Sequence, residues 1–280
     1  HCSVRRQRQM CIRDRQILFQ KLLVRIQSMN SYKIAFLNSK GGVGKSTLCI
    51  LSALGLSQTR FDGKIKLIDT DSQKSSLSIL NQVSSKIELD FIPFNHASPN
   101  LGVSLLDQKL KAYSVKEEII LIDTMAHPPR QLVNCIMQCD SILIPCNLSE
   151  IEILATIEFV KMLDSLKKLQ GSGSPHLIII PNKVPPKQVH INQLVDALSE
   201  VDVVIGPTIS DLAVFKNDLK GLSKKISNLP QNYKSQYTGF RDFIYKVLVK
   251  RQIDKLIAGE NETHNVSAET ENVIPISKNN

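Results

Sequence analysis

A glycine-rich segment runs Lys40-Gly41-Gly42-Val43-Gly44-Lys45-Ser46-Thr47. It follows the apolar stretch Tyr32–Leu37, which predicts a short buried strand. It leads into Lys45–Leu56, whose leucines recur at close to helical spacing. A strand, a glycine-rich turn and a helix in this order gather backbone N–H groups and a helix N-terminus around one point, an arrangement that binds phosphate. Glycines permit positive φ angles and a close approach of the backbone to a ligand.

The polar side chains of this segment suit a nucleotide. Lys45 supplies a positive charge for the β- and γ-phosphates, and Ser46 supplies a hydroxyl for Mg²⁺. Ser39 stands where a standard phosphate-binding loop has its first glycine, and Lys40 precedes the glycine pair instead. A chance glycine turn would not combine strand, lysine, hydroxyl and helix, so we expect a phosphate-binding loop here.

Short apolar strands alternate with helical stretches along the rest of the chain. Strands are predicted at Lys64–Asp69, Lys86–Ile92, Glu118–Asp123, Ser141–Pro145, His176–Pro181 and Val203–Ile205, and helices at Arg130–Gln138, Ile151–Leu169, Gln188–Ser199, Asp211–Leu219 and Phe240–Ile257. Several strands are apolar throughout, which is typical of a sheet buried on both faces. The pattern therefore predicts an α/β fold, a doubly wound and mostly parallel sheet with helices on both faces.

Acidic residues close two of the predicted strands. Asp69 ends one strand and is followed by Asp71, while Asp123 ends another. Ligands of such sheets bind at the carboxyl ends of the strands, so we expect these carboxylates to lie beside the glycine-rich segment. A solvated turn would also explain two acids at a strand end, but the neighbouring phosphate loop favours a binding site.

The segment at residues 40–47 resembles the deviant Walker A motif of the ParA/MinD family of P-loop ATPases. Asp69-Thr70-Asp71-Ser72-Gln73 is similar to the family's Asp-x-Asp-Pro-Gln segment, and Ile119–Thr124 is similar to a Walker B strand. The resemblance covers about Tyr32–Lys250, with the stronger motifs in its first half. It implies binding of ATP with Mg²⁺ and slow hydrolysis that a partner protein stimulates.

The resemblance also implies a role for each residue of the site. Lys40 would reach across an ATP-bound homodimer to the partner's nucleotide, where a second cation would help to neutralise the transition state. Lys45 would stabilise phosphate charge, Asp71 would position the attacking water, and Ser46 and Asp123 would hold the metal with support from Asp69. The nucleotide-binding residues would be Gly41, Gly42, Val43, Gly44, Lys45, Ser46, Thr47, Asn182 and Pro207.

Some of these residues have simpler explanations, and two segments depart from the family pattern. Asn182 would contact the adenine ring, but a loop cap explains it nearly as well. Ser72 replaces the family's usual proline. Met125-Ala126-His127 intervenes before the prolines that follow the Walker B strand. His127 would lie near the site, although an exposed loop histidine is the favoured interpretation.

A phosphate loop indicates chemistry and leaves the purpose open. The first hypothesis is DNA or plasmid partition, in which an ATP-bound homodimer binds non-specific DNA and a ParB-like or other adaptor protein stimulates hydrolysis. Salt-sensitive phosphate contacts would come from basic residues of the C-terminal third, although a solvated charged face also explains them. These residues are Lys216, Lys220, Lys224, Lys225, Lys234, Arg241, Lys246, Lys250, Arg251 and Lys255.

The sequence also holds candidate features for two other classes of function. A MinD-like, membrane-associated positioning ATPase needs an amphipathic helix, for which Phe240–Ile257 is the candidate. A closing helix packed on the core is the favoured interpretation of that stretch. Redox or metal delivery needs a cysteine pair, but Cys135 and Cys139 are four apart and do not form Cys-x-x-Cys. We expect both cysteines to be small buried apolar residues.

The formal net charge of +9 is concentrated near the N-terminus. Residues 1–28 hold seven Lys and Arg residues against Asp14, a net +6, which leaves +3 for residues 29–280. We expect residues 1–28 to be a non-native or disordered basic extension, with a nucleic-acid-binding arm as the alternative. Residues 29–258 are expected to form the ATPase domain and residues 259–280 a flexible polar tail. No apolar run approaches the roughly 20 residues of a transmembrane helix, so we expect a soluble chain. The resemblance to partition ATPases implies a cytoplasmic, nucleoid-associated protein.

Overall fold

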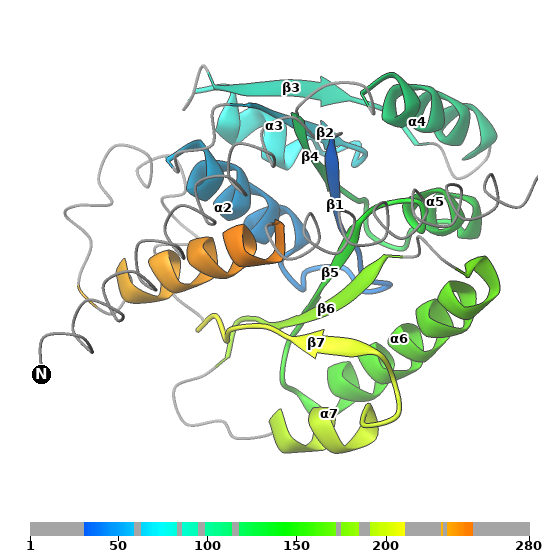
Figure 1. Ribbon diagram of the computed structural model, residues 1–280, viewed down its shortest axis with the longest axis vertical. Helices are drawn as coiled ribbons and strands as arrows, with labels where there is room; N and C mark the ends of the chain where they lie inside the picture. Colours follow the sequence, from blue (N-terminus) through cyan, green and yellow to red (C-terminus); the bar gives the residue numbers. More distant parts are fainter. Residues whose placement is uncertain are drawn as a thin grey trace, which may run out of the picture.

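The computed structural model describes residues 31–58, 63–82, 86–94, 99–113, 118–171, 175–184, 191–210, 231 and 234–248. These residues form a seven-stranded sheet with helices on both faces (Figure 1). The strand order is β3-β2-β4-β1-β5-β6-β7, and every neighbouring pair is parallel. The predicted doubly wound parallel sheet is therefore confirmed.

The elements follow one another as alternating strands and helices. The strands are β1 Tyr32–Phe36, β2 Lys64–Asp69, β3 Ile87–Phe91, β4 Glu118–Asp123, β5 Ser141–Cys146, β6 His176–Pro181 and β7 Val203–Ile205. The helices are α2 Lys45–Ser57, α3 Ser75–Leu80, α4 Pro99–Tyr113, α5 Arg130–Ile136, α6 Glu150–Gln170 and α7 Ile191–Ala197, and a further helix covers residues 234–248.

The register of the central strands brings their carboxyl ends level with one another. Phe36 at the end of β1 lies beside Asp123 of β4 and beside Leu143 of β5. Asp69 at the end of β2 lies beside the same Asp123. The loop that follows β1 and the acids that close β2 and β4 consequently meet at one edge of the sheet, as the sequence predicts.

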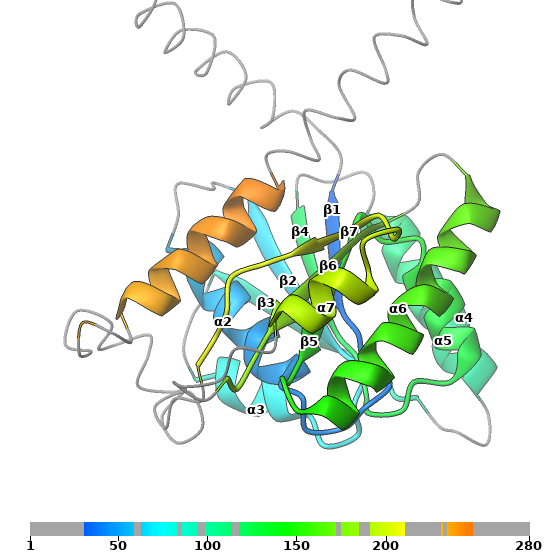
Figure 2. The same ribbon diagram turned by 90° about the horizontal axis from the view of Figure 1, so that it is seen from below.

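Two apolar cores lie on opposite faces of this sheet because successive strand residues point to opposite sides. Ile34 and Phe36 belong to the core shared with α2, α3 and the helix at residues 234–248. Ala35 belongs to the core shared with α4, α5, α6 and α7. Figure 2 shows α2 and the helix at residues 234–248 on one side of the strands, with α4, α5 and α6 on the other.

The C-terminal helix packs against the core. Phe240 and Ile244 are fully buried and Leu248 nearly so, and their spacing of four residues forms one apolar stripe. The helix is already formed at residue 234, six residues before the predicted start at Phe240, and its end lies outside the described residues. The interpretation as a core-packing helix is confirmed for residues 240–248. None of the helices in the described ranges is long and apolar enough to cross a membrane.

Helices α3 and α4 are the elements that the sequence analysis did not predict. Helix α4 begins at Pro99, a residue whose fixed φ angle suits the first helical position. Its buried residues Gly102, Leu106 and Leu110 recur every fourth position, which is a helical spacing. The predicted helix Asp211–Leu219 and the terminal segments at residues 1–28 and 259–280 lie outside the described residues.

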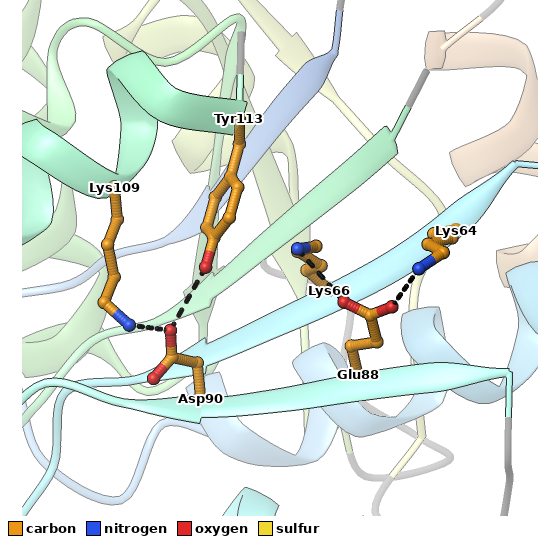
Figure 3. Close-up of polar contacts among 6 residues, drawn as sticks. All are labelled: Lys64, Lys66, Glu88, Asp90, Lys109 and Tyr113. Atoms are coloured by element: carbon orange, nitrogen blue, oxygen red, sulfur yellow. Dashed lines mark hydrogen bonds and ion pairs between the residues drawn. The ribbon is translucent and has the colours of Figure 1, made fainter. Parts of the chain in front are cut away.

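A mostly half-buried network of ion pairs and hydrogen bonds joins the edge strand β3 to its neighbours (Figure 3). Glu88 of β3 forms ion pairs with Lys64 at 2.6 Å and with Lys66 at 3.0 Å, and both lysines lie on β2. Asp90, on the same side of β3, binds side chains of α4. The six residues of the network are Lys64, Lys66, Glu88, Asp90, Lys109 and Tyr113.

Candidate nucleotide-binding site

The glycine-rich loop connects the central strand β1 to helix α2, as predicted. Gly42 has φ +74° and Gly44 has φ +101°, a conformation that residues with a side chain avoid. A Cβ atom at Gly44 would also lie 2.1 Å from Nδ2 of Asn182. Glycine at this position is thus required by both the backbone conformation and the close approach of Asn182.

A buried asparagine fixes the start of the loop. Asn38 directly follows the β1 region and is fully buried. Its Nδ2 donates to the carbonyl of Pro145 at 2.7 Å, and its Oδ1 accepts from the N–H of Lys40 at 2.9 Å. The side chain therefore ties the loop to strand β5. The sequence analysis missed this residue, although a polar residue at the end of an apolar strand was the available signal.

Lys45, the first residue of α2, turns its ammonium back into the loop. Nζ donates to the carbonyl of Lys40 at 2.8 Å and to that of Asn38 at 3.4 Å. Burial lowers the pKa of Lys45, while the charges of Asp123 and Asp71 act in the opposite direction. The loop thus places a largely desolvated cation where phosphate oxygens can replace carbonyl oxygens as its partners.

The two strand-end acids are bridged by a serine that the sequence analysis did not single out. Asp69 and Asp123 are fully buried. The hydroxyl of Ser76 on α3 lies 2.8 Å from Oδ2 of Asp69 and 2.5 Å from Oδ2 of Asp123. A hydroxyl has one proton to donate, so both contacts are satisfied together when one carboxyl group carries a proton.

Burial raises the pKa of both carboxyl groups of this pair. Burial raises the pKa of Asp123 to about 7, and the charge of Asp69 adds to the effect. Hydrogen bonds from Ser76 and Ser46 and the charge of Lys45 act in the opposite direction. Burial also raises the pKa of Asp69. The positive charge that the protein itself supplies near Asp69 and Asp123 is thus too small to keep both carboxyl groups ionised.

The donor atoms around Asp123 fit Mg²⁺. Oδ1 of Asp123 is buried and has no hydrogen-bond partner among the described residues, while the Ser46 hydroxyl contacts the same carboxylate. Hydroxyl and carboxylate oxygens are the hard ligands that Mg²⁺ prefers, together with phosphate oxygens. Ser46 and Asp123 would hold the ion, and Asp69 would support it through Ser76. The bound ion would neutralise charge on the phosphates.

Asp71 lies in the turn between β2 and α3, close to the buried acids. Its backbone N–H donates to Oδ1 of Asp69 at 2.9 Å, and its own Oδ1 accepts from the N–H of Gln73 at 3.0 Å. Ser72, which replaces the family's proline, is exposed in this turn. The turn therefore places Asp71 half-buried at the same edge, where its role in positioning water stays a prediction.

The segment after the Walker B strand packs against the glycine-rich loop. Thr124 donates to the carbonyl of Phe36 at 2.6 Å. The side chain of Ala126 lies 3.6 Å from the position that a Cβ of Gly41 would take. His127 is exposed and has φ +50°. The departure from the family pattern is thus an outward turn next to the loop, which fits the interpretation of His127 as an exposed loop residue.

Asn182 and Pro207 follow the ends of β6 and β7 at the same edge. The buried Asn182 donates from Nδ2 to the carbonyl of Val43 at 2.7 Å, so its side chain holds the glycine-rich loop. Pro207 is half-buried beyond β7, three strands away from β1. Thr47 is half-buried in the first turn of α2. The contact of Asn182 and Pro207 with a base stays a prediction.

Four cysteines of the described residues are buried and reduced: Cys49, Cys135, Cys139 and Cys146. Burial raises the pKa of Cys135 and of Cys146 to about 11, and it raises that of Cys139 as well. Thiols with a raised pKa are poor nucleophiles and poor metal ligands. The prediction that Cys135 and Cys139 are small buried apolar residues is confirmed.

A parallel sheet with a glycine-rich loop after its central strand, a buried lysine in that loop and acids at the two adjacent strand ends defines a P-loop nucleotide-binding fold. Residues 34–274 match the CobQ/CobB/MinD/ParA nucleotide binding domain. This chain belongs to that family, as the resemblance of its motifs indicated.

Known proteins similar to this chain share the fold. One is the Maintenance of carboxysome distribution protein A of Halothiobacillus neapolitanus, 24% identical over 195 residues, which cover 68% of this chain and 84% of that protein. An ATP complex of a McdA variant from Cyanothece has a TM-score of 0.59 at 18% identity, covering 79% of this chain and 97% of that one. A plasmid partition protein from Borrelia burgdorferi B31 bound to AMPPNP has a TM-score of 0.54 at 21% identity, covering 79% and 99%.

Proposed function

We propose that this protein is a Mg²⁺-dependent partition ATPase. It dimerises on ATP, binds DNA without sequence specificity, and hydrolyses ATP slowly until a ParB-like or other adaptor protein stimulates it, driving DNA or plasmid segregation on the nucleoid in the cytoplasm. Family membership and the geometry of the phosphate loop support the ATPase activity. The similar plasmid partition protein and the similar carboxysome distribution protein support a role in moving a cargo.

The placement of Lys40 carries the proposal. Its N–H is held by Asn38 and its carbonyl by Lys45, so the backbone of Lys40 is fixed within the loop. Its side chain is exposed, and no described residue pairs with the ammonium. A cation that projects outward from a fixed phosphate loop is suited to the phosphates of a second copy, as an arginine finger is.

Apolar surface at the same edge of the sheet also supports dimerisation. Helix α6 begins just after β5 reaches this edge, and Ile151 and Leu154 in its first turns are 79% and 64% exposed. Large aliphatic side chains gain free energy when a partner covers them, by about 1.5–3 kcal/mol for each one fully buried. A second copy that faces the nucleotide edge would cover both residues and bring its own Lys40 to the site.

The described part of the chain offers some support for DNA binding. Lys234, Arg241 and Lys246 lie on the C-terminal helix, where Lys246 is exposed and Arg241 is paired with Asp242. The other seven basic residues named in the sequence analysis lie outside the described residues. The same helix gives the MinD-like alternative no support, because Phe240 and its neighbouring apolar residues are used in the core.

DNA binding by the full chain, measured in a salt series with ATP, ADP or no nucleotide, tests the proposal. We expect binding to random-sequence duplex DNA only with ATP, weakening steeply as salt rises. Lys40→Ala should abolish this binding while it leaves the affinity for ATP itself within about threefold, since one outward side chain is lost. Because the basic residues 1–28 are present in every arm, nucleotide dependence separates the proposed dimer from simple charge attraction.

Two outcomes would contradict the proposal. Equal DNA binding with and without nucleotide would show attraction by fixed charge alone. Absence of DNA binding under every condition, with ATP turnover intact, would remove the partition role and leave the ATPase.

A further inference from the structure

Two consecutive residues at the end of β6 bind two consecutive carbonyl groups of the glycine-rich loop. Asn182 donates from Nδ2 to the carbonyl of Val43 at 2.7 Å. Lys183 donates from Nζ to the carbonyl of Gly42. Lys183 was not among the site residues that the sequence predicted, and neither the phosphate chemistry nor the metal site described above uses it.

The backbone around Lys183 is anchored on both sides. The N–H of Asn182 donates to the carbonyl of Cys146 at 2.8 Å, and the N–H of Val184 donates to the carbonyl of Ile209 at 3.1 Å. Between them, Lys183 has φ +55°, a conformation more usual for glycine or asparagine than for lysine. This conformation directs the half-buried lysine side chain to the loop.

Holding these two carbonyl groups also orients two N–H groups. In a planar trans peptide, the carbonyl of one residue and the N–H of the next point in opposite directions. The bonds from Lys183 and Asn182 pull the carbonyls of Gly42 and Val43 toward β6. The N–H groups of Val43 and Gly44 must then face the other side of the loop, where phosphate oxygens bind.

We propose that Lys183 is a positioning residue, which holds the Gly42 carbonyl so that the loop's N–H groups face the phosphates before a nucleotide arrives. Preorganisation of this kind lowers the cost of ordering the loop on binding. The inference rests on the proposed binding of ATP. It assigns to Lys183 a role different from that of Lys45, whose ammonium exchanges carbonyl partners for phosphate.

The test compares three substitutions of Lys183 in the full chain by the affinity for ADP, which avoids hydrolysis. Lys183→Gly and Lys183→Asn suit the positive φ angle and remove the ammonium. We expect both to weaken ADP binding by about tenfold to a hundredfold, the usual range for a lost charge-assisted hydrogen bond. Lys183→Arg, which keeps a donor of similar length, should stay within about threefold of the wild type.

A matched control separates this role from a general effect of the backbone. Lys74 is another lysine with positive φ, at +49°, and its ammonium lies over the Phe91 ring instead of contacting the loop. Lys74→Gly should leave ADP affinity within about twofold. Melting temperatures of all variants, measured without nucleotide, establish that each variant is folded at the temperature of the binding assay.

A second readout does not depend on nucleotide binding. In ¹⁵N-labelled protein without nucleotide, the amide signals of Val43 and Gly44 should shift in Lys183→Gly and stay unchanged in Lys74→Gly. Unchanged amide signals, or ADP affinity equal to the wild type in both Lys183→Gly and Lys183→Asn, would overturn the inference. If the wild-type chain binds no nucleotide, the proposed function fails, and the amide signals still decide the role of Lys183.

Discussion

Carboxylates occur in two contrasting settings on neighbouring strands of this protein. At the exposed edge, Glu88 meets two lysines of β2, and these cations lower the pKa of the carboxyl group. At the carboxyl edge, Asp69 and Asp123 lie fully buried with a serine between them, and burial raises the pKa of Asp123 to about 7. The acids of the first network each pair with a lysine, whereas Asp69 and Asp123 form no ion pair with a described residue.

The difference indicates where the functional site lowers the stability of the folded protein. A buried acid pair without a matching cation destabilises the fold, because desolvation is not offset by a nearby positive charge. Lys45 is close enough to lower the pKa of Asp123, but its effect is the smallest of those acting on that group. The missing positive charge is what a bound Mg²⁺ would supply. Buried acids without an ion pair beside the phosphate loop therefore mark the functional site, and acids paired with lysines mark the scaffold.

The largest expected effect comes from removing the charge of Asp123. Asp123→Asn should lower ATP turnover by at least about a hundredfold, because the Mg²⁺ ligand is lost. The same change should stabilise the protein without nucleotide by about 2–4 kcal/mol at pH 8, since a buried charge is removed. Turnover assays and urea unfolding measure the two effects. Loss of stability along with activity would show that Asp123 is a structural acid like Glu88.

The stabilisation by Asp123→Asn should depend on pH. Asp123 has a pKa of about 7 in the folded protein and about 3.8 when unfolded, so the folded state binds more protons between these values. Wild-type stability therefore falls as pH rises from about 4 to 7 and levels off above it, as far as this group is concerned. The gap between Asp123→Asn and wild type should be small at pH 5 and widest at pH 8.

Binding of Mg²⁺ with nucleotide should displace the proton from the Asp123 carboxyl group. The metal needs ionised Asp123, so affinity should rise with pH up to about 7 and release protons below that value. Titration calorimetry in two buffers of different ionisation enthalpy measures the released protons. A constant heat in both buffers at pH 6 would show that Asp123 is already ionised.

Removal of the bridging hydroxyl has an intermediate effect. In Ser76→Ala the bond that lowers the pKa of Asp123 is lost, so the pH at which Mg²⁺ binding reaches half its maximum should move upward. Stability should fall by about 1–3 kcal/mol, as buried acid oxygens lose a partner. Ser76→Thr, which keeps the hydroxyl, serves as the matched control. Equal pH profiles for Ser76→Ala and wild type would remove Ser76 from the site.

The sequence predicted the parts of this site that are encoded locally. The phosphate loop is a contiguous motif, and Asp69 and Asp123 each close an apolar strand, so their meeting follows from a parallel sheet. Ser76 and Lys183 were not predicted, because no local pattern distinguishes them from other polar loop residues. The packing of α3 brings Ser76 to the site, and the backbone conformation just after β6 brings Lys183 to the loop.

The network of lysine-paired acids should give the smallest effect, and it completes the comparison. Glu88→Gln should destabilise the protein by about 1 kcal/mol or less, since exposed ion pairs contribute little, and salt should reduce the difference further. Turnover and Mg²⁺ affinity should stay unchanged, because Glu88 lies on the edge strand away from the phosphate loop. Urea unfolding at low and high salt, alongside turnover, measures both. A loss of activity comparable to that of Asp123→Asn would mean that pairing of acids with lysines does not separate scaffold from site in this protein.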